Sequence, residues 1–301
     1  MAQQMGRQSL QFENPPWIIS SGCIAGTKEG EGPIGHEIDL IGEDDNFGCD
    51  IWEEAESTLQ KEALTLALGK AGLRADELRY LFAGDLLGQS MATSFGLQPF
   101  EIPLFGLYGA CSTAGEALAL AAMTVAAGYA DVVGAVTSSH FASAEKQFRF
   151  PLEYANQRPL CTTWTVTGAG AFLLGRESGK KQNYSDNRKR TDAGSPMIKR
   201  AEQKIADDTE QKVCGVRITG ITTGKIVDYG VRDSMNMGAA MAPAAADCIQ
   251  AHLKDFSRSP SWYDKIITGD LGCRQRNLTG SVGTEKDRHW KLSYRLRTGN
   301  L

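Results

Sequence analysis

The sequence is poor in the residues that build metal sites and disulfide frameworks. Its four histidines are scattered along 301 residues, and no two of them have the spacing of metal ligands. The seven cysteines are odd in number and include no Cys-x-x-Cys pair, which argues against zinc and against a disulfide scaffold. We therefore expect no bound metal, and reduced thiols in a reducing compartment.

The sequence also lacks a long apolar run and a large excess of either charge. Its most apolar stretch, residues 117–130, is about fourteen residues long and too short to span a bilayer. Residues 1–17 are polar and lack the apolar core of a secretory signal peptide. The formal net charge of −4 gives no electrostatic case for nucleic acid. These absences predict a soluble protein without a transmembrane segment and without a nucleic-acid partner.

What the sequence does contain is an alternation of apolar strands and helices. Hydrophobic residues make up 42% and charged residues 23%, as in a globular protein with ample core. We predict strands over residues 17–26, 78–90, 98–112, 130–140, 166–176 and 263–272. We predict helices over residues 50–71, 113–128 and 238–256, the second closed by Gly128. This order is typical of an α/β fold with helices packed on layered sheets.

One region differs sharply in composition from the rest. Residues 177–212 are highly charged and have almost no apolar side chains, which is typical of an exposed linker or insertion. We place this linker at 179–212. It separates a first half over residues 14–178 from a partial second half over residues 213–272.

A short internal repeat suggests that the two halves have the same fold. Leu81–Leu86 aligns with Ile266–Leu271 at an offset of 185 residues, and Asp85 falls on Asp270. Both copies have the order helix, short turn, apolar strand and Gly-Asp-Leu. The repeat therefore favours an internally duplicated α/β fold.

The second copy is shorter than the first. Ninety-one residues separate Asp85 from Arg176, but only 31 follow Asp270. The last 29 residues, 273–301, carry seven Lys or Arg against two acids and show no clean hydrophobic period. We expect a truncation or a shift of reading frame after about residue 272. The alternative is a genuine basic tail that binds an acidic partner.

Cys111 is the first candidate for chemistry. It follows a predicted strand in a Gly-Ala-Cys-Ser-Thr turn and opens an apolar helix. A helix N-terminus stabilises a thiolate, and small neighbours give a substrate access. The same pattern also fits a buried thiol that behaves as a small hydrophobe, and the residues alone leave both interpretations open.

Three further polar residues lie near the predicted strand ends. His140 ends a core strand and is the candidate base for Cys111, or else a hydrogen-bonded residue without a chemical role. Arg149 lies between two phenylalanines, where its planar fork suits a carboxylate, or where its stem simply packs on the rings. Asp85, in a Gly-Asp-Leu turn, can orient a site, coordinate a cation or cap the turn.

Over residues 14–178 and 213–272 the sequence resembles the stage V sporulation protein AD family, thiolase-like proteins of spore-forming Firmicutes. The matching motifs are GPIGHEID (32–39), LFAGDLLGQ (81–89), FGLYGACSTAGEAL (105–118), TVTGAGA (165–171) and two long runs at 136–159 and 223–247. The two long runs are the most specific.

The resemblance implies a duplicated thiolase fold with α-β-α-β-α layers. It also implies that the protein binds dipicolinic acid (pyridine-2,6-dicarboxylate), free or as its calcium chelate, for uptake into the developing spore. No cofactor is implied, apart from calcium carried with the ligand. The implied partners are membrane proteins of the same operon and a second copy in a homodimer, and the implied location is peripheral, at the spore inner membrane. The pocket residues that the resemblance implies are Asp85, Cys111, Ser139, His140 and Arg149.

Two other functions stay open. Cys111 matches the position of the thiolase nucleophile, so a condensing acyltransferase with His140 as partner is the alternative. Condensing enzymes complete their site with residues from the second half, which we expect to be missing after about residue 272. We therefore expect Cys111 to line a ligand pocket and not to turn over. The third interpretation is a structural docking subunit with an inert pocket.

Overall fold

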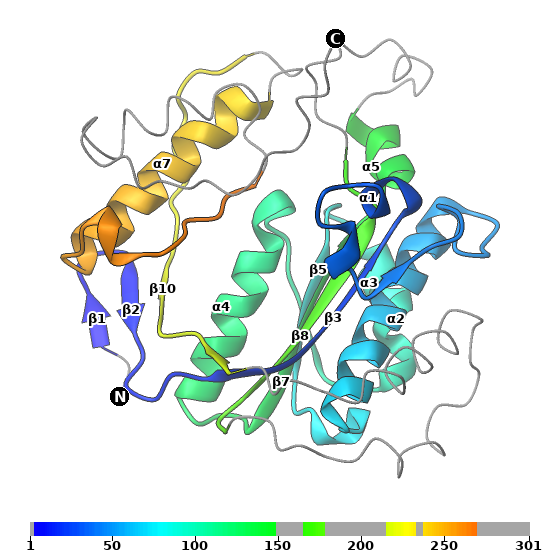
Figure 1. Ribbon diagram of the computed structural model, residues 1–301, viewed down its shortest axis with the longest axis horizontal. Helices are drawn as coiled ribbons and strands as arrows, with labels where there is room; N and C mark the ends of the chain where they lie inside the picture. Colours follow the sequence, from blue (N-terminus) through cyan, green and yellow to red (C-terminus); the bar gives the residue numbers. More distant parts are fainter. Residues whose placement is uncertain (1–2, 149–164, 178–214, 233–236, 270–301) are drawn as a thin grey trace. The chain divides into compact units, whose positions relative to one another are not determined.

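The computed structural model describes residues 3–148, 165–177, 215–232 and 237–269 (Figure 1). They form two compact units. The larger unit contains the described residues between Glu13 and Thr219. The smaller unit combines the described residues up to Phe12 with those from Gly220 onward. The predicted linker over 179–212 and tail over 273–301 lie outside the described residues, as do the domain boundaries predicted at 178 and 213.

The larger unit is built on a seven-stranded mixed sheet of order β4-β3-β8-β7-β5-β6, with β9 paired to β3. β5 is parallel to β6 and β7, whereas β8 is antiparallel to β7 and β3. The predicted strands of this region are all present, but β5 and β6 are much shorter than the strands predicted over 78–90 and 98–112. The strands are β3 (Trp17–Ala25), β4 (Leu40–Ile41), β5 (Leu81–Asp85), β6 (Leu104–Gly106), β7 (Val132–Ser139), β8 (Gly168–Gly175) and β9 (Val216–Arg217).

Helix α2 (Trp52–Ala71) covers one face of this sheet, and its apolar stripe forms much of the core. Leu59, Ala63 and Leu64 are completely buried in it. Gly22 on β3 allows the close packing, because a Cβ there would lie 2.4 Å from the carbonyl oxygen of Ala63. The helix predicted over 50–71 is therefore confirmed.

Helix α4 (Thr113–Ala126) lies on the opposite face of the sheet from α2 (Figure 1) and packs on β5 and β7. It ends at Gly128 as predicted. Gly128 has φ +81°, a conformation that favours glycine, and its N–H donates to the Val125 carbonyl. The remaining helical segments of the larger unit are α1 (Thr27–Gly30), α3 (Met91–Leu97), α5 (Phe141–Phe148) and the 3-10 turns η1 (Gly35–Glu37), η2 (Ala75–Glu77), η3 (Gln98–Phe100) and η4 (Ala110–Ser112).

The smaller unit pairs a three-stranded antiparallel sheet with one helix. Asp255, at the end of the helix, accepts hydrogen bonds from the Gln8 N–H (3.0 Å) and the Ser9 hydroxyl (2.9 Å), which join the N-terminal strands to it. The elements are β1 (Gln3–Met5), β2 (Ser9–Gln11), β10 (Gly220–Thr222), α7 (Met237–Asp255) and η7 (Pro260–Trp262).

The strand predicted over 263–272 does not form in its described part, residues 263–269. The Tyr263 hydroxyl instead hydrogen-bonds Nε2 of His252, and Ile267 is 69% exposed. A strand needs neighbours that pair with its backbone and cover its apolar side chains, and within residues 263–269 no such pairing is present.

None of the helices in the described segments has the length and apolar character needed to cross a bilayer.

Candidate functional site

The candidate site lies at the edge of the large sheet where β5, β6 and β7 end. These three strands are parallel, so their carboxyl ends meet at one edge. Asp85, the last residue of β5, pairs in register with Ser138 of β7, and Ser139 and His140 follow directly. The chain leaves β6 with the Leu107 N–H bonded to the Ala83 carbonyl, and the Cys111 turn follows. The structure thus brings the ends of these strands together at one edge.

The Cys111 turn is packed tightly on β5. Gly84 permits this, because a Cβ there would lie 2.2 Å from the Leu107 carbonyl oxygen and 2.8 Å from Cγ2 of Thr113. Thr113 is the first residue of α4, and its hydroxyl accepts a hydrogen bond from the Gly109 N–H at 3.0 Å. The turn and the helix start are therefore fixed against the strand.

Cys111 is exposed within this turn. The residue before it, Ala110, has φ +47°, a left-handed conformation that is strained for alanine. Strained backbone of this kind clusters at functional sites. The thiol is accessible at the start of α4, which argues against its interpretation as a buried hydrophobe.

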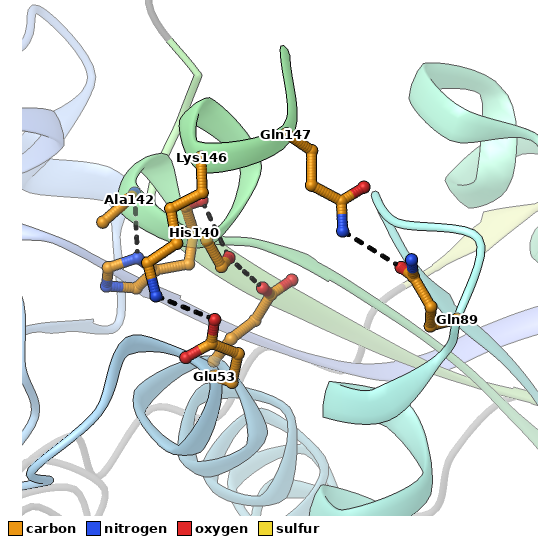
Figure 2. A network of polar contacts seen from close by, with 8 residues as sticks. Glu53, Gln89, His140, Ala142, Lys146 and Gln147 are labelled. Atoms are coloured by element: carbon orange, nitrogen blue, oxygen red, sulfur yellow. Dashed lines mark hydrogen bonds and ion pairs between the residues drawn. The ribbon is translucent and has the colours of Figure 1, made fainter. Parts of the chain in front are cut away.

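His140 is completely buried and both of its ring nitrogens are engaged. Nδ1 accepts the Ala142 N–H at 3.2 Å (Figure 2), so the proton belongs on Nε2, which lies 2.7 Å from the Asp45 carbonyl oxygen. The ring also packs against Trp52 and Phe141, at centroid distances of 5.4 and 5.2 Å. Burial lowers the pKa of His140, which keeps the ring neutral.

The carboxylate of Asp85 is also hydrogen-bonded to neighbouring groups of the protein. Its Oδ2 accepts hydrogen bonds from the Thr93 backbone N–H (3.0 Å) and hydroxyl (2.8 Å), near the start of α3, and Oδ1 accepts the Leu87 N–H at 3.2 Å. The Ser139 hydroxyl donates to the Val166 carbonyl at 2.6 Å. Arg149 lies outside the described residues, directly after α5. The ligand-binding role of these residues stays a prediction.

Sequence reasoning missed a group of side chains beneath this edge, which we call the buried polar cluster. Its centre is Gln60, whose Nε2 donates to the Ser138 hydroxyl (2.8 Å) and the Thr93 hydroxyl (3.0 Å). Ser138 in turn donates to Glu56 (2.9 Å), and Thr93 donates to Asp85. One amide thus links two carboxylates through two hydroxyls. The cluster consists of Glu56, Gln60, Asp85, Thr93, Ser138 and Ser143.

Glu56 has the most unusual electrostatics in the cluster. It is only 2% exposed, and burial raises its pKa to about 7, with Asp85 and Glu53 adding to the increase. Hydrogen bonds from Ser143 and Ser138 act in the opposite direction. The signal in the sequence was a pair of polar residues, Glu56 and Gln60, four apart within the apolar stripe of α2.

Helix α5, which follows His140, is held by contacts with α2 and with the loop after β5 (Figure 2). The Ser143 hydroxyl donates to Glu56 (2.7 Å), and Lys146 pairs with Glu53 on α2 (2.9 Å). Gln147 donates to Gln89 in the loop after β5 (3.3 Å). These contacts fix the position of α5.

Among the described residues, no group of three or more His, Cys, Asp and Glu side chains is arranged to hold a metal ion.

The sequence profile of the family Stage V sporulation protein AD (SpoVAD) matches residues 6–295. This chain belongs to that family. It is 38% identical over 266 residues to Stage V sporulation protein AD of Bacillus subtilis, covering 88% of this chain and 68% of the relative. The family membership confirms the resemblance drawn from the motifs.

Solved structures give the fold. The chain superposes on cerulenin-bound OleA of Xanthomonas campestris with a TM-score of 0.53 and 13% identity, over 92% of this chain and 81% of that one. It superposes on 3-oxoacyl-(acyl carrier protein) synthase III of Xanthomonas oryzae with a TM-score of 0.51 and 13% identity, over 90% and 82%. At such low identity these likenesses show a thiolase-like fold and no more, as predicted.

Proposed function

We propose that this family member binds dipicolinic acid, free or as its calcium chelate, for uptake into the developing spore, and does not catalyse acyl transfer. Family membership supports the role in sporulation. The start of α4 at this edge supports the binding of a planar dianion, because the partial positive charge at the N-terminus of a helix attracts anions. Arg149 would add a planar fork for a carboxylate. Calcium would arrive with the ligand.

One observation carries the non-catalytic part of this proposal. Both nitrogens of His140 are already hydrogen-bonded in a buried, neutral ring. A cysteine nucleophile needs a base with a nitrogen that can reach its thiol. His140 would have to break a buried hydrogen bond to serve as one, which is costly. Cys111 is therefore better suited to line the pocket.

Calorimetric titration of the full chain with dipicolinate, with and without calcium, tests the binding. We expect saturable binding that Arg149→Ala abolishes. Arg79→Ala removes an exposed arginine elsewhere and is the matched control for loss of one positive charge. Absence of binding by a chain whose circular dichroism shows it folded would refute the proposal.

A thioester-dependent condensing acyltransferase is the second candidate. It is favoured by the exposed Cys111 that follows the strained Ala110 at a helix start. An acyl thioester would then increase the intact mass of the chain by one acyl group, and Cys111→Ala would abolish the increase. We expect no such increase.

The proposal extends to partners and location. We place the protein at the spore inner membrane as a peripheral partner of membrane proteins from the same operon, and as a homodimer. Strand β6 supports the dimer, because it ends the sheet and exposes Leu104 (41%) and Phe105 (51%). Light scattering of wild type and Leu104→Glu tests it. Membrane association without ligand binding would favour the docking-subunit interpretation.

A further inference from the structure

Glu56 lies beneath the candidate site, close to two other acidic side chains. It projects from α2 and contacts hydroxyls of β7 and α5, through Ser138 and Ser143. Two acids act on it, Asp85 from β5 and Glu53 from one turn earlier on α2. The ammonium of Lys146 on α5 pairs with Glu53, and His140, which precedes α5, is neutral. Glu56 therefore responds to any further negative charge at this edge of the sheet.

The hydrogen bonds around Glu56 suit both of its protonation states. The Ser143 hydroxyl lies 2.7 Å from Oε2 of Glu56 and 3.1 Å from the His140 carbonyl oxygen, but it has a single proton. When Glu56 is ionised, Ser143 donates to the carboxylate. When Glu56 is protonated at Oε2, it donates to Ser143, and Ser143 turns its proton to the His140 carbonyl. Neither state leaves a buried donor unpaired at this hydroxyl.

We propose that binding of a dicarboxylate at this edge is coupled to uptake of a solvent proton by Glu56. This inference rests on the proposed function. A dianion beside Asp85 adds negative charge to a region that already holds two buried carboxyls. Protonation of Glu56 cancels one of those charges, and the Ser143 hydroxyl accommodates it without movement of the backbone.

Linkage gives the direction of the pH dependence. Because the ligand raises the proton affinity of Glu56, protonation must raise the affinity for the ligand by the same factor. The affinity is therefore higher at pH 6.5 than at pH 8.5. The ligand itself does not titrate in this range, since carboxyl groups of this class ionise near pH 4.

The experiment is calorimetric titration of the full chain with pyridine-2,6-dicarboxylate at pH 7.5 in phosphate and in Tris, which differ in ionisation enthalpy. Proton uptake appears as a difference in observed enthalpy between the two buffers. We expect wild type to take up a fraction of a proton, and to bind about fivefold or more tightly at pH 6.5 than at pH 8.5. Glu56→Gln should show neither effect. Glu54→Gln, exposed on the same helix, should behave as wild type.

A second variant, Ser143→Ala, tests the coupling independently in case Glu56→Gln does not fold. Ser143→Ala removes a donor that stabilises ionised Glu56 more than it stabilises the neutral acid, so the pH of maximal proton uptake should move upward. Binding without proton uptake in wild type, or unchanged uptake in Glu56→Gln, overturns the coupling and leaves the proposed function standing. Absence of binding by a folded chain overturns both.

Discussion

The Cys111 turn and the buried polar cluster share one edge of the sheet but differ in how their polar groups are satisfied. The turn is exposed and strained at Ala110, and its thiol is accessible. The cluster is buried, and its hydroxyls and carboxyls are bonded to one another. Groups that bind a ligand must be accessible to it, whereas groups that fix positions are bonded to other groups of the protein. The difference supports the proposal that the turn contacts the ligand and that the cluster fixes its position.

The largest expected effect comes from disrupting the close packing of the Cys111 turn on β5. In Gly84→Ala the new Cβ would lie 2.2 Å from the Leu107 carbonyl oxygen, which is backbone and cannot turn aside. We expect the free energy of unfolding in urea to fall by about 3 kcal/mol or more. The Cys111 turn would have to move away from β5.

Gly106→Ala is the control for that substitution. Gly106 lies on the neighbouring strand β6, and a Cβ there meets no atom within 4 Å. We expect a change within about 0.5 kcal/mol. Equal losses in the two variants would mean that strand glycines in general, and not the packing of the turn on β5, limit stability.

The second-largest expected effect concerns the raised pKa of Glu56 in the buried polar cluster. The pKa of Glu56 is about 7 in the folded chain, against an ordinary 4.5. Between these values the folded state holds a proton that the unfolded state has released, so stability falls as pH rises through this window. Relative to Glu56→Gln, wild type should lose up to about 3 kcal/mol between pH 5 and pH 8.

The measurement is urea unfolding at four pH values, with Glu54→Gln as the control for loss of an exposed acid from the same helix. Parallel curves for wild type and Glu56→Gln would show that Glu56 has an ordinary pKa. The contrast between the buried cluster and the exposed turn would then have no electrostatic part.

The sequence predicted the fold because its signals are local. Apolar runs and the Gly128 stop mark β3, β5, β7, β8 and helices α2 and α4. The resemblance to the family grouped Asp85, Cys111 and Ser139, and the structure brings the ends of their strands to one edge of the sheet. The strand expected over 263–272 failed because an apolar run forms a strand only where another strand pairs with it.

The hydrogen-bond partners of the site residues could not be predicted from the sequence. Both ring nitrogens of His140 are hydrogen-bonded, Nε2 to the Asp45 carbonyl and Nδ1 to the Ala142 N–H. Asp45 is 95 residues away in the sequence. The cluster joins α2, α3, α5, β5 and β7, and no sequence spacing relates them. Glu56 and Gln60 could have been noticed as polar residues in an apolar stripe. Nothing in the sequence indicates their partners.

The third effect removes one link of the cluster. Thr93→Val keeps the shape of the side chain and deletes a buried hydroxyl that accepts from Gln60 and donates to Asp85. Asp85 retains two backbone N–H donors, so the loss should be about 2 kcal/mol in urea unfolding. Thr65→Val is the matched control, since its hydroxyl bonds only the Lys61 carbonyl within α2, and should cost no more than about 0.5 kcal/mol.

The smallest effect concerns the surface contact that accompanies the cluster on α5. Lys146→Met removes the ion pair with Glu53, whose side chains are 42% and 34% exposed, and keeps the apolar stem. Exposed pairs contribute little because water and salt screen them, so we expect a loss of about 0.5 kcal/mol in low salt that vanishes near 1 M salt. A loss as large as that of Thr93→Val would mean that α5 is held mainly by its surface contact. The expected small loss would mean that the buried bond from Ser143 to Glu56 holds it.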